Sequence, residues 1–500
     1  MLVLSKSKLL AYRQCPKRLW LEIHRPTLRH DSATTTASFS IGNQVGEIAR
    51  QMYDPTKQGQ MVDVQGEGIA AALAHSTVLL NSSQPIFEAG FRAAGALAFA
   101  DVLLPVTTEG TKAWRMIEVK SSTSVKYYHR DDVAVQAFVA RSAGVDLRAI
   151  ALAHIDSSWV YPGGGDYQGL LQEHDLTAEA FDRGVEVEAW IADAQHIASQ
   201  VTEPQISTGR HCEDPYECGF LCHCRGQEPP VDFPASWLPR VQSKALKKLI
   251  VEDGVTDMRA IPDELLTQTQ LRVKRQTLAG EIYFDAINAA SDLSAIEFPV
   301  YFLDFETTQF AVPIWAGTRP YQQIPFQFSL HCFTGQSPLE HYSFLDLTGQ
   351  DPSEAFAQAL VDSCGKDGPV FVYNAGFEMA RIKELAIRFP LLRESLLAIN
   401  ERVVDLLRIA EQRYYHPSQQ GSWSIKKVLP TIAPDLRYDA LEGIKDGGMA
   451  MTAYQEAISP ESTEARKKQI HQQLLAYCGL DTLALVRLWQ FFSGRNDAVS

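Results

Sequence analysis

Apolar residues form short runs that predict strands in both halves of the chain. Residues 86–105 (IFEAGFRAAGALAFADVLLP) and 114–122 (WRMIEVKSS) read as neighbouring strands, and residues 131–140 (DDVAVQAFVA) follow with a helical pattern. From Phe298, the run FPVYFLDFETT predicts a buried strand rich in aromatic residues. Later segments alternate strand and helix patterns up to LLAYCGLDTLALVRLW, which predicts a helix. The alternation predicts an α/β fold for the second half.

The same pattern divides the chain into three parts. Residues 1–228 form one unit that ends at a group of cysteines, and a Pro-rich stretch follows at Gly226–Pro239. Residues of about 240–295 look helical and amphipathic, so we expect 229–297 to be a helical linker. Residues 298–500 form the second unit. A length of 500 residues fits this division, since ordinary domains contain about 100–200 residues.

Composition and charge narrow the possible functions. The formal net charge of -14 argues against a protein that coats polyanions through a generally basic surface. A protein that binds a polyanion at one local site remains compatible, because metal-binding carboxylates contribute negative charge and a basic groove can coexist with an acidic whole. The chain has no apolar run of about 18 residues, and its first residues lack the apolar core of a secretory signal. We therefore expect a cytoplasmic protein with no membrane partner.

Acidic residues of the second half follow the spacing of a metal site. Asp304 and Glu306 lie two apart on the predicted strand, so they point to the same face. Two buried carboxylates on one face repel each other, and a bound cation removes that cost. Glu378 begins a helix after the apolar strand at 370–373, and Tyr477 and Asp481 share a helix face because they lie four apart.

This constellation resembles the DEDD superfamily of 3′→5′ exonucleases, in particular its tyrosine-bearing branch. The resemblance covers residues of about 298–492 and implies a ribonuclease H-like fold with two Mg²⁺ or Mn²⁺ ions about 4 Å apart. It implies that Asp304 bridges the ions, that Glu306 and Asp481 ligate one of them, and that Tyr477 orients the attacking water.

Three other features of the second half bear on this resemblance. The second motif of the family normally carries an aspartate, whereas this chain has Glu378 after Asn374-Ala-Gly-Phe. The longer side chain puts the metal spacing or the rate in question. Asp405 is a candidate supporting carboxylate, and the segment WSIKKVLP at 423–430 is similar to one that these exonucleases place beside the substrate.

The first half carries a second acidic motif. Asp101 lies on one predicted strand, and Glu118 and Lys120 face the same way on the next. With Gln136 on the following helix, these residues resemble the PD-(D/E)XK nuclease core of the RecB-like subgroup. The resemblance implies a restriction-endonuclease-like fold in which Asp101 and Glu118 hold a metal ion. Other candidates are Glu88, near the same metal, and Glu47, at a position where many relatives carry a histidine.

The cysteines of the first half form a separate motif. Cys15 lies on a predicted N-terminal helix beside basic residues, and Cys212, Cys218 and Cys224 lie close together near residue 228. One early and three late cysteines resemble the iron–sulfur staple of RecB-like nucleases, which implies a structural [4Fe–4S] cluster. Four thiolates also suit zinc, so zinc stays open as an alternative. Cys222 is either surplus to such a site or replaces one of its neighbours as a ligand.

These motifs lead to one main expectation and two alternatives. The main expectation is a metal-dependent nuclease, a 3′→5′ exonuclease, that acts on DNA that is single-stranded or has a free end, and RNA stays open as an alternative substrate. DNA repair or the processing of foreign DNA would suit such an enzyme. The first alternative is a nucleic-acid-binding scaffold in which one or both sites are inactive. The second is a redox sensor that uses the cluster.

Overall fold

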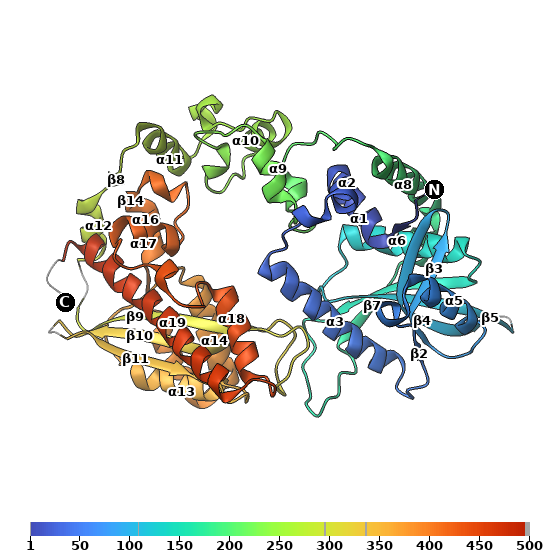
Figure 1. Cartoon of the computed structure of the whole chain (residues 1–500). Helices are drawn as coiled ribbons and strands as arrows, with labels where there is room; N and C mark the ends of the chain where they lie inside the picture. Colours follow the sequence, from blue (N-terminus) through green and yellow to red (C-terminus); the bar gives the residue numbers. More distant parts are fainter. Residues whose placement is uncertain (1, 109, 295–296, 336–337, 496–500) are drawn as a thin grey trace. The chain divides into compact units, whose positions relative to one another are not determined.

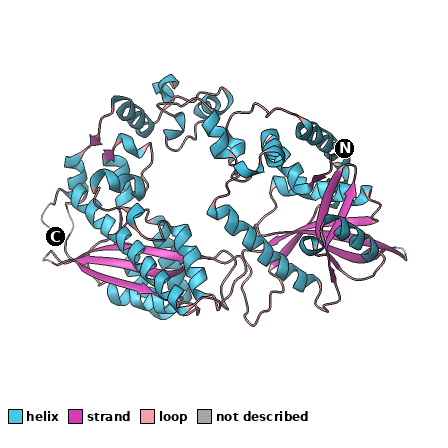
Figure 2. Ribbon diagram, in the orientation of Figure 1, coloured by secondary structure: helices cyan, strands magenta, loops and turns pink. Residues whose placement is uncertain are grey.

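The chain folds as a mixed α/β protein with two compact units (Figure 1). The computed structural model describes residues 2–108, 110–294, 297–335 and 338–495. The N-terminal unit comprises Met1–Pro229 together with Phe310–Gln322, and the C-terminal unit comprises Pro230–Gln309 and Gln323–Ser500. Figure 2 shows one large sheet in each unit, with helices against it. No helix in the described part of the chain has the length and apolar content needed to cross a bilayer.

The N-terminal unit is built on a seven-stranded sheet in the order β2-β3-β4-β5-β6-β7, with β1 paired to β4. Strands β3, β4 and β5 form an antiparallel meander, whereas β6 runs parallel to β5 because helix α6 provides the crossover between them. The strands are β1 (Leu4–Ser5), β2 (Gln60–Met61), β3 (Ile86–Ala93), β4 (Ala96–Thr108), β5 (Thr111–Lys120), β6 (Leu147–Ile155) and β7 (Leu171–Asp175).

Helix α6 lies against the core of this sheet. Its small and β-branched residues are buried between the helix and the strands, and its packing contacts run to β3, β4 and β6. The helices of the unit are α1 (Lys6–Gln14), α2 (Pro16–His24), α3 (Ala33–Tyr53), α4 (Val64–Glu67), α5 (Ile69–Leu79), α6 (Tyr127–Ser142), α7 (Thr177–Asp182), α8 (Gly184–Ser199) and α9 (Leu221–Gln227).

The C-terminal unit has a five-stranded sheet in the order β11-β10-β9-β12-β13. Strand β9 is central, antiparallel to β10 and parallel to β12. The strands are β9 (Val300–Thr308), β10 (Ile324–Phe333), β11 (Glu340–Leu345), β12 (Val370–Val372) and β13 (Val403–Asp405), with a separate pair of β8 (Tyr283–Phe284) and β14 (Tyr414–Tyr415). The helices are α10 (Lys244–Lys247), α11 (Gln268–Ala279), α12 (Ala286–Asp292), α13 (Ser353–Ser363), α14 (Gly376–Arg388), α15 (Arg393–Glu401), α16 (Leu406–Arg413), α17 (Ile425–Ile432), α18 (Gly447–Ile458) and α19 (Glu464–Ser493).

Alternate residues of β9 pack into two different cores. Leu303 and Phe305 belong to the core that contains Phe356 of α13, on one face of the sheet. Phe302 belongs to the other core, where its ring centroid lies 5.6 Å from that of Trp489 on α19. Since side chains of a strand alternate between faces, the even-numbered residues of β9 face α19.

Residues 230–294 are part of the C-terminal unit rather than a separate linker. Ala235, Leu246, Met258 and Val273 are buried in the same core as Phe302, so the helical segment packs onto the C-terminal sheet. Sequence periodicity predicts its helices but not the face that they cover. Residues Phe310–Gln322, within the expected second unit, instead pack into the N-terminal unit.

Candidate functional site

Three carboxylates meet beside β9 in the C-terminal unit. Asp304 and Glu306 come from the even-numbered face of β9, and Asp481 comes from α19, which packs against that face. One oxygen of each lies within 4.8 Å of the others, the only such group of three potential metal ligands among the described residues. Glu306 and Asp481 are each only 7% exposed. The structure therefore brings together three of the four predicted ligands.

Burial and mutual repulsion make these carboxylates hard to ionise together. Burial, followed by repulsion from Asp481, raises the pKa of Asp304 well above its usual range and that of Glu306 to about 8. Burial raises the pKa of Asp481 to about 6, although a hydrogen bond from Tyr438 and attraction from Lys426 oppose the shift. Three negative charges in this space need a cation for balance. Oδ2 of Asp481 is buried without a hydrogen-bond partner, which leaves it available to a ligand.

Glu378 lies next to this triad but is not part of the group within 4.8 Å. It is in the first turn of α14 and 3% exposed, and its charge contributes to the raised pKa of Asp304. Burial, with repulsion from Asp405, raises the pKa of Glu378 to about 8. Its Oε2 atom is buried without a hydrogen-bond partner. Glu378 is therefore a buried carboxylate beside the triad, with one oxygen that makes no hydrogen bond.

Asp405 has a structural role beside this site. Its Oδ1 atom accepts hydrogen bonds from the N–H of Leu407, at 3.0 Å, and from the N–H of Asn374, at 2.9 Å. The first bond caps α16. The second holds Asn374, whose φ of 74° is in the left-handed region that few L-residues adopt, just before α14 begins. Asp405 thus fixes the turn that carries Glu378.

Two phenols and one lysine surround Asp481. Tyr438 donates a hydrogen bond of 2.6 Å to Oδ1 of Asp481. Tyr477, one turn before Asp481 on α19, is 5% exposed, and burial followed by the negative charge of Asp481 raises its pKa. Nζ of Lys426 lies 5.4 Å and 5.5 Å from the ring centroids of Tyr438 and Tyr477. Lys426 belongs to the predicted WSIKKVLP segment, whereas no sequence pattern indicated Tyr438, which lies in a short turn.

A buried network fixes α19 next to Asp481. Thr482 Oγ1 lies 2.6 Å from Oγ of Ser329 and 2.8 Å from Nδ1 of His331, and Ser329 Oγ lies 2.8 Å from Nε2 of His341. These partners are on β10 and β11, so the network holds the helix at one register along the sheet. The register determines where Asp481 and Tyr477 point.

The acidic residues of the N-terminal unit are neutralised by lysines. Oε1 of Glu118 accepts hydrogen bonds from Lys6, at 2.8 Å, and from Lys120, at 2.6 Å. The same lysines contact Asp132, at 2.9 Å and 2.5 Å, and Gln136 donates to Oε2 of Glu118. Burial raises the pKa of Glu118, but the two lysines outweigh it and hold the pKa well below its usual value. The structure thus joins three predicted residues and adds Lys6 and Asp132.

Asp101 and Glu88 lie at the edge of this network. Oδ2 of Asp101 accepts a hydrogen bond of 2.7 Å from the N–H of Val119, and burial and then Glu118 raise the pKa of Asp101 well above its usual range. Glu88 interrupts the pairing of β3 with β4 and has a φ of 56°, a strained conformation for a glutamate. Glu47 forms an ion pair with Arg50.

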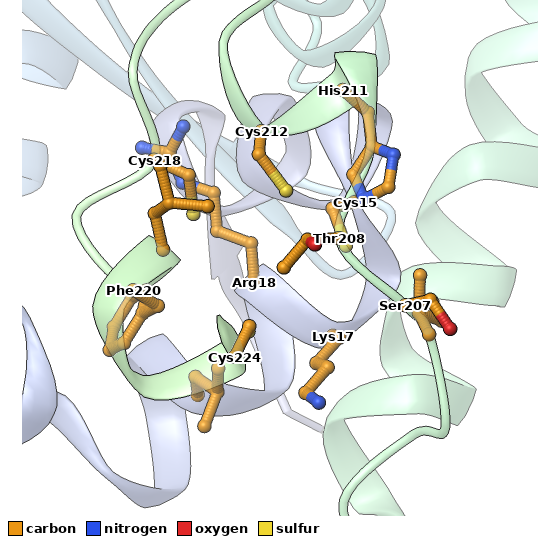
Figure 3. A pocket seen from close by; sticks show the side chains of 13 residues that line it. Cys15, Lys17, Arg18, Ser207, Thr208, His211, Cys212, Cys218, Phe220 and Cys224 are labelled. Carbon is orange, nitrogen blue, oxygen red and sulfur yellow. The ribbon is translucent and has the colours of Figure 1, made fainter. Parts of the chain in front are cut away.

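The four predicted cysteines line one pocket of the N-terminal unit (Figure 3). Cys15 lies between α1 and α2, and Cys224 is on α9. Cys15, Cys212 and Cys218 are buried, and all four thiols are free. Burial raises the pKa of Cys224 to about 11, and Lys17 opposes that shift. Cys222 is exposed and does not line the pocket.

Comparison with known proteins adds one result. A family model described as a domain of unknown function (DUF2779) matches residues 301–424. The matched span contains Asp304, Glu306 and Glu378, and it ends before Tyr477 and Asp481. No curated protein matches the chain.

Proposed function

We propose that the protein is a metal-dependent nuclease, and that its C-terminal unit is a ribonuclease H-like 3′→5′ exonuclease. The acidic triad of Asp304, Glu306 and Asp481, three buried carboxylates with oxygens within 4.8 Å of one another, carries this proposal. The central position of β9, between an antiparallel and a parallel neighbour, supports the fold that the sequence resemblance implies. Nucleic acid, DNA or RNA, is the proposed substrate.

The residues of the triad fit divalent metal ions. Carboxylate oxygens are the ligands that Mg²⁺ and Mn²⁺ prefer, and a bound cation would remove the repulsion that raises the pKa values of these groups. Asp304, Glu306 and Asp481 would hold the ions, with Glu378 as a further ligand. Bound Mg²⁺ or Mn²⁺ supplies Lewis-acid stabilisation of the phosphodiester and a more acidic water.

The surrounding side chains have separate tasks in this proposal. The hydrogen bond from Tyr438 fixes Oδ1 of Asp481 and leaves Oδ2 directed elsewhere. The Tyr477 phenol is protonated at neutral pH, and burial and Asp481 raise its pKa further, so its hydroxyl can donate to and orient a water molecule. Lys426, which attracts Glu306 and Asp481, supplies positive charge for a phosphate at the same place.

Release of mononucleotides from end-labelled single-stranded DNA and RNA in Mg²⁺ tests this proposal. Asp304→Asn should lower the rate at least about 100-fold, since it removes a central ligand at nearly constant volume. The matched control Glu118→Gln, in the other unit, should keep most of the activity. If Glu118→Gln instead abolishes release and Asp304→Asn does not, the N-terminal unit is the cutting unit and the proposal fails. The position of the label reports the direction of digestion.

For the N-terminal unit, a second role has specific support. We infer a PD-(D/E)XK-like domain that holds the phosphate backbone rather than cutting it. Both oxygens of Glu118 already have partners, two lysines and Gln136, so the network needs no metal for charge balance. Lys6 and Lys120 are about one-fifth exposed and can contact an anion. Cleavage by this site would require the lysines to leave Glu118.

We further propose a [4Fe–4S] cluster on Cys15, Cys212, Cys218 and Cys224. Zinc with Zn–S bonds of about 2.3 Å would draw four sulfurs to about 3.8 Å from one another. Among the described residues, no three of the cysteine sulfurs lie within 4.8 Å of one another, and the iron–sulfur assignment is supported by the resemblance of the cysteine motif to the staple of RecB-like nucleases. Anaerobic purification followed by iron, sulfide and zinc analysis tests the assignment. Zinc without iron would overturn it.

A further inference from the structure

A large groove in the N-terminal unit connects the surroundings of the cysteine pocket with the Glu118 network. It has a volume of about 1040 Å³, more than most pockets for small ligands. Lys120 and Asp132 line one part of it. Arg18 and His211 line another part and also border the cysteine pocket (Figure 3).

Three aromatic side chains in the groove are unusually exposed. Tyr127 is 60% exposed, Phe39 is 57% exposed and Tyr216 is 49% exposed. They come from α6, α3 and the loop between Cys212 and Cys218. Tyr127 and Tyr216 contact Tyr128 edge-on, with ring centroids 5.4 Å and 4.9 Å from its own, and exposed rings that gather along one groove indicate a surface that is covered by a ligand.

The lining of the groove is rich in cationic side chains, although the whole chain carries a net charge of -14. It contains six lysines and arginines against four aspartates and glutamates, and each of the six cations forms an ion pair with a carboxylate that a bound phosphate could replace. Arg210 projects furthest into solvent, with 81% of its side chain exposed. Lysine and arginine side chains beside flat aromatic rings suit a polyanion with planar groups.

We propose that this groove binds a single strand of nucleic acid, whose bases stack on Tyr127, Tyr216 and Phe39. A duplex is a weaker fit, because its bases are stacked on one another and have no free faces. The inference rests on the proposed function for the kind of ligand, but not on which unit cuts. DNA and RNA offer the same stacking and charge, so the experiment separates them.

The loop at 212–218 forms a fixed wall of the groove. Its ends are joined by a hydrogen bond of 2.8 Å from the N–H of Cys218 to the carbonyl of Cys212. Gln14, next to Cys15, donates to the carbonyls of His211, at 2.8 Å, and Tyr216, at 2.7 Å. A Tyr216 ring held by this loop is preorganised for stacking, which lowers the entropy cost of binding.

Fluorescence anisotropy with labelled oligothymidylate, oligouridylate and a duplex tests the groove. Measurements on the full chain without divalent ions prevent cleavage. Tyr216→Ala and Phe39→Ala should each weaken binding of a single strand at least about five-fold, and Tyr216→Phe, which keeps the ring, should bind like the wild type. Tyr342→Ala is the matched control, because Tyr342 is 41% exposed and lies in the other unit.

Each outcome of these measurements supports or overturns the proposal that the groove binds a single strand. Absence of single-strand binding by the wild type, or unchanged affinity in the Tyr216→Ala/Phe39→Ala double variant, overturns the groove. Tighter binding of the duplex overturns it as well. If Asp304→Asn leaves nucleotide release intact but Tyr216→Ala still weakens binding, the proposed exonuclease fails and the groove stands. If Asp304→Asn abolishes nucleotide release and the aromatic variants bind a single strand normally, the proposed exonuclease stands and the groove proposal fails.

Discussion

The two acidic sites of this protein balance their charges in different ways. In the N-terminal unit, Glu118 and Asp132 share two lysine ammonium groups at 2.5–2.9 Å, and Gln136 occupies the remaining oxygen of Glu118. In the C-terminal unit, Asp304, Glu306 and Asp481 lie together with no comparable ion pair among the described residues. A carboxylate cluster that already has internal cations is complete without a metal, whereas one without them needs a cation from outside.

The largest expected difference between the two sites is in metal affinity. The double variant Asp304→Asn/Glu306→Gln should bind Mn²⁺ at least about 100-fold more weakly than the wild type in isothermal titration calorimetry, because it removes two charged ligands. Glu118→Gln should bind Mn²⁺ with the affinity of the wild type. Equal losses of Mn²⁺ affinity in the two variants would contradict this distinction between the two acidic sites.

Stability of the metal-free protein should change in opposite directions. Glu118→Gln leaves Lys6 and Lys120 without their shared carboxylate, and we expect it to lower the free energy of unfolding by about 3 kcal/mol. Asp304→Asn relieves repulsion and should raise it by about 1 kcal/mol at pH of about 8. Chemical denaturation measures both values. Destabilisation by both variants would mean that repulsion does not dominate the C-terminal site.

The pH dependence should also differ in sign. Glu306 and Glu378 have pKa values raised to about 8, so the folded state holds their protons more tightly than the unfolded state does. Stability of the metal-free protein should therefore fall as pH rises from about 4.5 to about 8, and saturating Mg²⁺ should reduce that slope. Glu118 has a lowered pKa, so its contribution is present at neutral pH and is lost on acidification. Thermal melting across this range, for the wild type and Glu306→Gln, measures the slopes; identical slopes would contradict the assignment.

The smallest expected effect concerns the phenol on Asp481. Tyr438→Phe removes the 2.6 Å hydrogen bond to Oδ1 and should slow nucleotide release about ten-fold, equivalent to about 1.4 kcal/mol, with unchanged metal stoichiometry. The matched control is Tyr414→Phe. It removes a buried hydroxyl that is bonded to Thr431 rather than to Asp481. A rate for Tyr438→Phe equal to that of the control would show that the bond does not position the carboxylate.

Local periodicity accounts for the part of both sites that could be predicted. The alternation along β9 placed Asp304 and Glu306 on one face, and the four-residue spacing on α19 placed Tyr477 and Asp481 together. Tyr438 was not predicted, because it lies in a turn without periodicity. Lys6 was missed since it reaches Glu118 from 112 residues away, a contact that depends on the packing of α1 and not on any local pattern.

Domain boundaries, too, could be predicted only where a local sequence pattern marks them. The Pro-rich stretch at 226–239 does mark the end of the N-terminal unit, near Pro229. Packing, however, assigns the following helices to the C-terminal core, and a sequence pattern that shows an apolar face does not show its partner. The placement of Phe310–Gln322 depends on contacts with residues more than a hundred positions earlier, so no local signal indicated it.

Because Phe310–Gln322 packs into the N-terminal unit, cleavage of the chain at one position cannot give two intact units. Ala311 and Val312 complete a small core with Val45, Ile155 and Leu170, and Tyr321 donates to the carbonyl of Ser121, next to Lys120. A fragment that stops near Pro229 would expose this core to water, and a fragment that begins there would carry an apolar hairpin tip with nothing to bury it. Two separately folded fragments therefore need two changes. The first fragment has to include residues 310–322, attached through a linker. In the second fragment, a short turn has to replace those residues and connect β9 to β10.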